Sequence, residues 1–401
     1  MLIFFHNSYQ GMGGVENLIF NIAQYIDTEK NEKVKIFGSK DSYLFNRIID
    51  EKVNCEFIDS SNYIKDVTFD ENDTIILFSY IDCFKQFYSC KAKIVIWNVL
   101  TYSIIQWNRM NVEKKLTGQN MIAHYLAKKL VISCFKKESI ICMDGDTKNQ
   151  LNKFINKELN FPLIPIPIYF EYKFNKYITN NRATDCSFLR ITYIGRGSEY
   201  WKIVPIERVL KDLNTEGIKY ELHIFTDFNY KFEEILNPIK FNNSIYYHFN
   251  VFGKSLRDKL LEISDLHFGM GTSALEGAAL GIPTVLVDPS NFPIPDNYLY
   301  QWLFEKKEFS LGAFIDKEIH FSGHRITHII NSIRVEKDRY DISHKCFQYV
   351  ADKHSLNVTV TLLKKLQPQT QFKDIFRFTP NSWKISTLLK PLTFVLSKLN
   401  S

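Results

Sequence analysis

The sequence lacks the cysteine pattern of a zinc site or a disulfide framework. Its seven cysteines are an odd number and none of them forms a Cys-x-x-Cys pair, which favours a reducing compartment. Long apolar runs are also absent, since no stretch approaches the roughly 20 apolar residues of a membrane-spanning helix. The apolar start at residues 1–5 has no basic segment with it, so it is interpreted as a first β-strand and not as a signal peptide.

An excess of charge of one sign is missing from most of the chain. The net charge is +6, and residues 364–401 supply all of it, with seven basic residues against Asp374 alone. The balance elsewhere argues against a broad basic face and therefore against a nucleic-acid partner. At 401 residues the chain exceeds what one hydrophobic core organises, so we expect two domains of roughly 150 to 200 residues each.

The N-terminal half opens as a strand, a glycine loop and a helix. Residues 2–5 are a continuous apolar run, and residues 17–26 repeat apolar side chains on one helical face. The loop is not the dinucleotide-binding fingerprint, because Glu16 stands where a third glycine or alanine is needed. Gly13 and Gly14 would instead bring backbone amides close to a ligand at the carboxyl end of the first strand. A purely structural turn is the alternative.

Alternating strand and helix patterns continue to residue 168 and imply a doubly wound parallel sheet. Apolar runs at 34–37, 74–78, 94–97 and 140–143 predict strands, and helical spacing over 111–137 predicts a long helix. Two titratable residues of this half are candidates for catalysis. Asp82 follows a predicted strand, and His124 lies on the long helix. For each of them a structural role is the alternative.

A proline-rich crossover precedes a second α/β domain. Three prolines in residues 159–168 favour an extended segment, and residues 169–187 are polar and irregular. We therefore place an N-terminal domain at 1–168, a linker at 169–187, a second domain at 188–355, and a C-terminal helix with a tail at 356–401. The second domain opens on a strand at 189–194, and a glycine turn flanked by Arg196 and Lys202 follows. This pair suits a diphosphate, because arginine offers a planar fork and lysine a point charge, although solvated surface charges are the alternative.

Residues 267–288, HFGMGTSALEGAALGIPTVLVD, are the most informative stretch of the second domain. They predict a strand, a tight turn through Gly271, a short helix and a second strand. Thr272 and Ser273 can cap the helix while its free N–H groups and positive dipole end face a phosphate. Glu276 lies one turn further along and could accept hydrogen bonds from a ribose. An ordinary strand-to-helix turn with a solvated glutamate is the alternative.

Together these patterns resemble glycosyltransferases of the GT-B type, and those of family 4 in particular. The resemblance covers about residues 1–355. It rests on Gly13-Gly14-x-Glu16, on the Tyr-Ile-Gly-Arg strand end with Lys202 after it, and on Glu276 before Gly281-x-Pro283. It implies two Rossmann-like α/β domains facing a central cleft, and retaining sugar transfer from a nucleotide sugar with no metal or other cofactor. It assigns the donor diphosphate to Gly13, Gly14, Arg196, Lys202, Gly271, Thr272 and Ser273, and the ribose to Glu276.

One position departs from this family. A second acidic residue commonly lies eight positions before the ribose-binding glutamate, and here that position is Phe268. The contacts with the donor sugar must therefore differ, and the stereochemistry of transfer is open. An inverting enzyme would need a base in the N-terminal domain, for which Glu16, Asp82 and His124 are the candidates.

Rival functions use the same residues differently. Residues 269–274 also match the shorter G-x-G-x-x-A fingerprint with Asp288 after the next strand, as in an NAD-dependent oxidoreductase, but Arg196 and Lys202 would then have no role. A UDP-sugar 2-epimerase of the same fold needs the same grip on the diphosphate, together with acidic and histidine groups of which the N-terminal half offers few. A non-enzymatic binding protein is the third class.

The C-terminal residues 372–399 interleave aromatic and aliphatic side chains with lysines. This pattern predicts binding to an anionic membrane surface. A helix packed on the N-terminal domain, or on a second subunit of a homo-oligomer, is the alternative. With the resemblance, the pattern predicts a cytoplasmic enzyme at the inner face of the membrane. Its acceptor would be a saccharide or lipid-linked saccharide of bacterial surface polysaccharide synthesis, such as capsule or lipopolysaccharide O-antigen.

Overall fold

The computed structural model describes residues 1–6, 13–59, 69–78, 90–99, 118–169, 174, 188–227, 230–315 and 321–376, with the backbone alone at 118–124 and 230. The chain divides into two units, Met1–Ile166 with Thr359–Ser401, and Pro167–Val358. The chain passes from the first unit to the second within the proline-rich segment. It returns to the first unit inside α13 (Leu356–Lys365). The chain end, which the sequence analysis set apart as a helix and tail, therefore belongs to the first unit.

The first unit is built on a six-stranded parallel sheet in the order β3-β2-β1-β4-β5-β6. Its strands are β1 (Leu2–Phe5), β2 (Lys35–Gly38), β3 (Glu56–Asp59), β4 (Thr74–Leu77), β5 (Lys93–Asn98) and β6 (Ile140–Cys142). Its helices are α1 (Gly14–Lys30), α2 (Tyr43–Asp50), α4 (Gly118–Lys136), α5 (Gly145–Ile155), α14 (Phe372–Phe376) and most of α13. Strand β3 was not predicted, because its two acidic ends interrupt the apolar run that marks the buried strands.

The chain end is part of the core of this unit. Phe372 and Ile375 on α14 are fully buried among side chains of β5, α4 and β6. Asp374 pairs with Lys137 at 2.8 Å between Oδ2 and Nζ, and the Ile94 amide donates to the Thr370 carbonyl. The predicted membrane segment therefore begins in the core, and its part from residue 377 onward lies outside the described residues.

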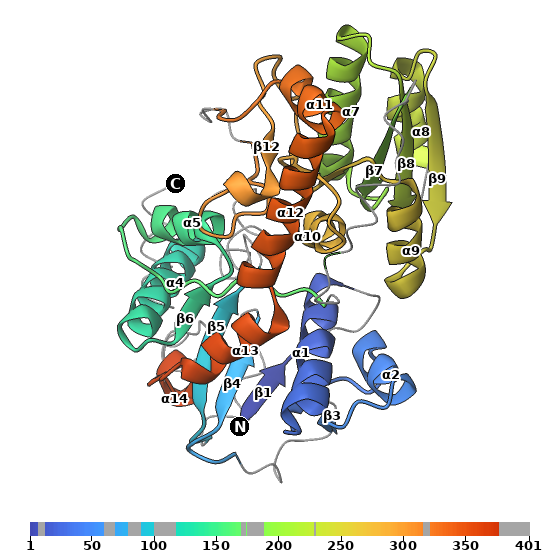
Figure 1. The fold of residues 1–401 in the computed structure, drawn as a ribbon. Helices are drawn as coiled ribbons and strands as arrows, with labels where there is room; N and C mark the ends of the chain where they lie inside the picture. Colours follow the sequence, from blue (N-terminus) through green and yellow to red (C-terminus); the bar gives the residue numbers. More distant parts are fainter. Residues whose placement is uncertain are drawn as a thin grey trace. The chain divides into compact units, whose positions relative to one another are not determined.

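The second unit contains a sheet in the order β12-β11-β10-β7-β8-β9, parallel except for β12. Its strands are β7 (Leu189–Ile194), β8 (Tyr220–Thr226), β9 (Ser244–Phe249), β10 (Leu266–Gly269), β11 (Thr284–Leu286) and β12 (Gln301–Trp302). Its helices are α7 (Tyr200–Thr215), α8 (Tyr230–Leu236), α9 (Gly253–Ile263), α10 (Thr272–Ala279), α11 (Ile326–Arg334) and α12 (Glu336–Lys353), with 3₁₀ turns at Asn237–Ile239 and Leu303–Glu305. The two parallel sheets with covering helices confirm the predicted α/β class (Figure 1).

The predicted strand, turn, helix and strand at 267–288 pack into the core of the second unit. Helix α10 packs against α12 as well as against β10 (Figure 1). Its buried residues are small except for Leu275, and Ala274, Gly277 and Ala278 among them let the helix approach the sheet closely. No helix of the described residues is long and apolar enough to cross a membrane.

Candidate functional site

The order of strands in the second sheet reverses between β7 and β10. From β7 the chain moves to β8 and β9 on one side, and then returns to β10 on the other. Strands β7 and β10 are parallel neighbours, with Tyr193 opposite Phe268, so the loops after them leave the same edge of the sheet. Open parallel sheets bind ligands at such a reversal, because the two loops diverge and leave a crevice there.

The loop after β7 is tied to the end of β8. The Gly195 amide donates to the Phe225 carbonyl, and the Gly197 amide donates to Thr226 Oγ1 at 3.0 Å and to Asp227 Oδ1 at 2.8 Å. A Cβ atom on Gly195 would lie 2.6 Å from the ring of Tyr193, so this position requires glycine. These contacts give the turn a defined shape.

The first turn of α7 is anchored on both sides. The Tyr193 hydroxyl donates to the Lys202 carbonyl at 2.6 Å, and the Ser290 amide donates to the Trp201 carbonyl at 3.2 Å. Pro205 has no N–H group for that Trp201 carbonyl, so the proline inside the helix leaves the acceptor to Ser290. The backbone that carries Lys202 is therefore held from the sheet and from the loop after β11.

Arg196 and Lys202, the two predicted diphosphate ligands, lie on this loop and on the helix turn after it. The Arg196 side chain is 48% exposed and that of Lys202 is 19% exposed. Burial lowers the pKa of Lys202, and its hydrogen bond with Glu199 acts in the opposite direction. Both cations pair with Glu199, at 2.5 Å for Lys202 Nζ and 3.8 Å for Arg196 Nη1.

The second loop leads into α10 through Gly271, the N-cap residue, at φ +57°. This left-handed conformation favours glycine. The prediction that Thr272 and Ser273 cap the helix is wrong. No side chain caps α10, because Ser273 lies inside the first turn, where its hydroxyl donates to the Met270 carbonyl and accepts from the Met270 amide. The first-turn N–H groups have no partner within the helix and no side-chain cap, which suits an anionic ligand.

His267 joins β10 to α10, a role that sequence reasoning missed. Its Nε2 donates to the Ser273 carbonyl at 3.0 Å, so its Nδ1, 3.0 Å from Thr192 Oγ1, accepts from that hydroxyl. Burial lowers the pKa of His267 to about 4, which keeps the ring neutral. A Cβ on Gly277 would lie 2.5 Å from the ring. The sequence signal was a histidine in an apolar strand followed by small residues.

Glu276 lies one helical turn into α10, where the prediction placed a ribose-binding carboxylate. Its side chain is only partly exposed, and burial raises the pKa of its carboxyl to about 7, with the charge of Arg257 acting in the opposite direction. Within the described part of the chain the carboxyl has no hydrogen bond and no ion pair within 4.0 Å. A ligand with hydroxyl donors would provide the missing hydrogen bonds.

Phe268, the residue that departs from the family pattern, is a core residue. Its side chain is fully buried on β10, and its ring meets the edge of Tyr300 at 6.0 Å between centroids. The side chain therefore serves packing.

The other predicted residues lie in the first unit. Gly13 is the N-cap of α1 and Gly14 its first residue. A Cβ on Gly13 would lie 2.2 Å from Glu16 Oε2, whereas one on Gly14 would meet nothing within 4 Å. Asp82 lies outside the described residues, and His124 lies on α4 without a described side chain.

Glu16 is buried and contacts a second residue that the sequence did not single out. Its Oε1 lies 2.9 Å from Nε2 of His6, the residue directly after β1. The strand order of the first sheet reverses between β1 and β4, so this pair lies at its reversal point. A histidine after a strand and a glutamate in the next helix turn was the available signal.

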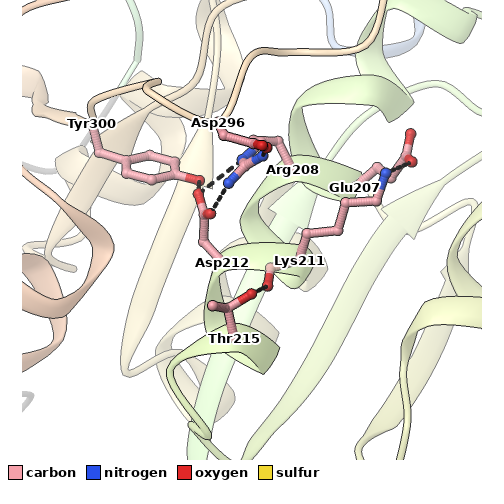
Figure 2. A network of polar contacts seen from close by, with 7 residues as sticks. All are labelled: Glu207, Arg208, Lys211, Asp212, Thr215, Asp296 and Tyr300. Carbon is pink, nitrogen blue, oxygen red and sulfur yellow. Dashed lines mark hydrogen bonds and ion pairs between the residues drawn. The ribbon is translucent and has the colours of Figure 1, made fainter.

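A separate polar network fixes the far part of α7. The Arg208 guanidinium pairs with Asp212 and Asp296, and the Tyr300 hydroxyl donates to Asp212 at 2.6 Å (Figure 2). An open groove of about 1190 Å³ runs past Arg208, Phe241 and Arg325. None of the predicted donor-binding residues lines it, so it is not the site at the strand reversal. In the described portion of the chain no group of three or more histidine, cysteine or acidic side chains could hold a metal ion.

Comparison with known proteins identifies the fold. No protein-family model and no curated protein matches the sequence. Solved structures match over most of their length. A glycosyltransferase from Rickettsia africae ESF-5 is 12% identical with a TM-score of 0.56, over 94% of this chain and 99% of that one. The fold is that of GT-B glycosyltransferases.

Two further GT-B structures agree. Sucrose-phosphate synthase from Thermosynechococcus elongatus has a TM-score of 0.55 at 9% identity, over 94% of this chain and 100% of that one. Anabaena Alr3699/HepE, solved in complex with UDP and glucose, has a TM-score of 0.51 at 10% identity, over 91% and 98%. At such identities the likeness establishes the GT-B fold and not the substrate.

Proposed function

We propose that this chain is a glycosyltransferase that moves a sugar from a nucleoside-diphosphate sugar to a saccharide or lipid-linked saccharide. The second unit would carry the donor site, at the reversal of its strand order. The observation that carries the proposal is the constellation at that point. Arg196 and Lys202 lie on the loop and first helical turn after β7. After the neighbouring strand β10, helix α10 has no side-chain cap at its N-terminus and carries Glu276, whose carboxyl has no hydrogen bond or ion pair among the described residues.

Each group has a role in this proposal. Glu276 accepts hydrogen bonds from the ribose hydroxyls. Arg196, Lys202 and the N-terminus of α10 bind the diphosphate, with the backbone amides of Thr272 and Ser273 as donors. The Gly271 amide donates to the Leu311 carbonyl at 2.7 Å, so Gly271 would contribute only the close approach of its backbone. Negative charge grows on the departing diphosphate as the glycosidic bond breaks, and these preorganised positive groups stabilise it. Because the chain itself supplies the positive charge, the proposed mechanism requires no metal ion. The assignment of Gly13 and Gly14 to the donor phosphates rests on the sequence resemblance alone.

We assign the reaction to the retaining class of family 4 on the basis of the sequence resemblance. The burial of Phe268 leaves contacts with the donor sugar to other groups, for which the backbone of residues 269–272 is the candidate. Among the three candidate bases for inversion, Glu16 is buried against His6. The anomeric configuration of the first-formed product, followed by proton NMR, tests this assignment, and inverted product would refute it.

The biological setting is part of the proposal. We place the enzyme in bacterial surface polysaccharide synthesis, with residues 377–401 attaching it to an anionic membrane surface. The support is the density of lysine and apolar residues in this segment, and the burial of α14 just before it, which would anchor the segment to the first unit.

Individual contacts and the expected turnover distinguish the proposed function from its two rivals, an NAD-dependent oxidoreductase and a UDP-sugar 2-epimerase. In an NAD site Asp288 would bind the adenosine ribose, but its Oδ1 accepts from the Ala313 amide and its Oδ2 from the Tyr298 hydroxyl. The UDP-sugar 2-epimerase is the closer rival, since it would grip UDP with the same residues. Turnover separates the two, because an epimerase converts its nucleotide sugar without an acceptor.

A ligand panel tests the proposed function. Thermal unfolding is measured with UDP-, GDP- and dTDP-sugars and with NAD, on the wild type and on Lys202→Met. Stabilisation of the wild type by a nucleotide sugar, reduced in Lys202→Met, is expected. Stabilisation by NAD alone would overturn the proposal. Conversion of UDP-N-acetylglucosamine without acceptor would favour the epimerase.

A further inference from the structure

Glu199 stands between the two cations of the proposed donor site. It precedes the first residue of α7, and its carboxylate lies 2.5 Å from Lys202 Nζ and 3.8 Å from Arg196 Nη1. Its side chain is 27% exposed as a whole, while Oε2, the oxygen that pairs with Lys202, is buried. A carboxylate therefore already neutralises the groups that would bind the donor's phosphates.

The carboxylate of Glu199 is directed at the cations and not at the helix. As the N-cap residue it could accept from the first-turn amides of α7, but it makes no such side-chain hydrogen bond. It is instead an anion at the N-terminal end of a helix, beside an arginine and a lysine, at the edge where open parallel sheets bind their ligands. An incoming phosphate would seek the same surroundings.

The backbone around Glu199 does not depend on these ion pairs. Hydrogen bonds from Tyr193 and Ser290 hold the first turn of α7, and Gly197 is bonded to the end of β8. An exchange of partners on Arg196 and Lys202 therefore requires only side-chain rotation. The diphosphate carries at least two negative charges against one on Glu199, so it would prevail in the exchange but with reduced net affinity.

We propose that Glu199 is an internal counter-ion that competes with the donor's diphosphate for Arg196 and Lys202. It lowers the affinity of the site for the nucleoside diphosphate product and so promotes release of that product. This inference rests on the proposed function. A carboxylate that only positioned the two cations would have the opposite effect, because its removal would then weaken nucleotide binding.

The two roles of Glu199 predict opposite effects of its removal, namely tighter UDP binding for a competing counter-ion and weaker UDP binding for a positioning residue. Binding of UDP and of uridine is measured by calorimetry on the full chain for wild type, Glu199→Gln and Glu199→Asp. Glu207→Gln is the matched control. Glu207 lies on the same helix, outside the loop that carries Arg196, and its carboxylate is 2.5 Å from Lys211 Nζ. Glu199→Gln is expected to bind UDP about 3- to 30-fold more tightly, with uridine unchanged. Glu199→Asp is expected to fall between it and the wild type, and Glu207→Gln to match the wild type.

Turnover supplies an independent readout. With a donor and acceptor in hand, kcat and KM of Glu199→Gln should fall together, because tighter product binding slows release. Equal or weaker UDP binding by Glu199→Gln would overturn the counter-ion role while leaving the proposed function intact. If Glu199→Gln does not fold, weaker or unchanged UDP binding by Glu199→Asp would overturn it in the same way. Absence of UDP, GDP and dTDP binding to the wild type would remove both proposals.

Discussion

Replacing Glu276 by glutamine separates the stability of the protein from its function. The ordinary pKa of a glutamate is 4.5, and burial raises that of Glu276 to about 7. Because the folded protein holds this proton more tightly than the unfolded chain, the wild type loses stability as the pH rises from 4.5 to 7, and the loss is complete above 7. Glutamine has the same shape and never ionises, so the variant escapes this loss.

The magnitude follows from the two pKa values. Linkage gives the wild type a penalty of about 1 kcal/mol at pH 5 and about 3 kcal/mol at pH 8. The value at pH 8 is an upper bound, because the partly exposed carboxyl gains hydration when it ionises. Glu276→Gln should therefore be more stable than the wild type by 1 kcal/mol or less at pH 5 and by roughly 2 to 3 kcal/mol at pH 8.

The same substitution should weaken nucleotide binding. A carboxylate that accepts from ribose hydroxyls makes charge-assisted hydrogen bonds, each worth about 1.5 to 3 kcal/mol, so UDP affinity should fall roughly 10- to 100-fold. Since hydroxyl donors favour the ionised carboxylate, affinity of the wild type for UDP should rise with pH through about 7 more steeply than that of the variant.

Two measurements test this reasoning. Urea denaturation at pH 5 and pH 8 compares wild type, Glu276→Gln and the exposed control Glu262→Gln, which should change stability by less than about 0.5 kcal/mol. Calorimetry with UDP and 2′-deoxy-UDP then completes a double-mutant cycle, in which the deoxy ligand and the glutamine variant should not be additive. If the stability difference between Glu276→Gln and the wild type were the same at pH 5 and pH 8, a desolvated carboxyl at Glu276 would be refuted. Strict additivity in the cycle would refute the contact of this carboxyl with the ribose.

Three further outcomes are expected. Lys202→Met should weaken UDP binding about 10-fold or more at low salt, while uridine binding is unchanged, and calorimetry in 0.05 and 0.5 M salt checks that the difference shrinks with screening. Gly13→Ala should destabilise the protein by about 1 to 3 kcal/mol, because its Cβ would collide with the Glu16 carboxylate, whereas Gly14→Ala should be neutral or slightly stabilising in thermal unfolding. A chain ending at residue 376 should keep the thermal stability of the full chain but lose co-sedimentation with anionic liposomes. A chain ending at residue 366 should unfold at lower temperature, because it loses two fully buried side chains of α14. Equal pelleting of the full chain and the 376-residue chain would refute membrane attachment.

Local pattern in the sequence was sufficient for most of the fold. Buried parallel strands are typically short apolar runs, and each of the four such runs predicted after β1 in the first half overlaps a strand of the sheet. The prediction missed β3 and the antiparallel β12, because an edge strand is only half covered and its apolar period is interrupted. It also separated the chain end from the first unit, because no local pattern records that α14 contributes Phe372 and Ile375 to a distant core.

The sequence by itself determined the kinds of group available for the candidate site: two cations after one strand, a glycine turn after another, and a glutamate one helical turn beyond. These follow from strand, turn and helix periods, which act over a few residues. Only the tertiary structure decided the state of each group, through contacts between residues distant in the chain. The surrounding protein raises the pKa of Glu276 to about 7, and the approach of α10 to β10 buries His267 as a neutral bridge. The anchored first turn of α7 sets Glu199 between Arg196 and Lys202, because burial and pairing depend on how the elements pack.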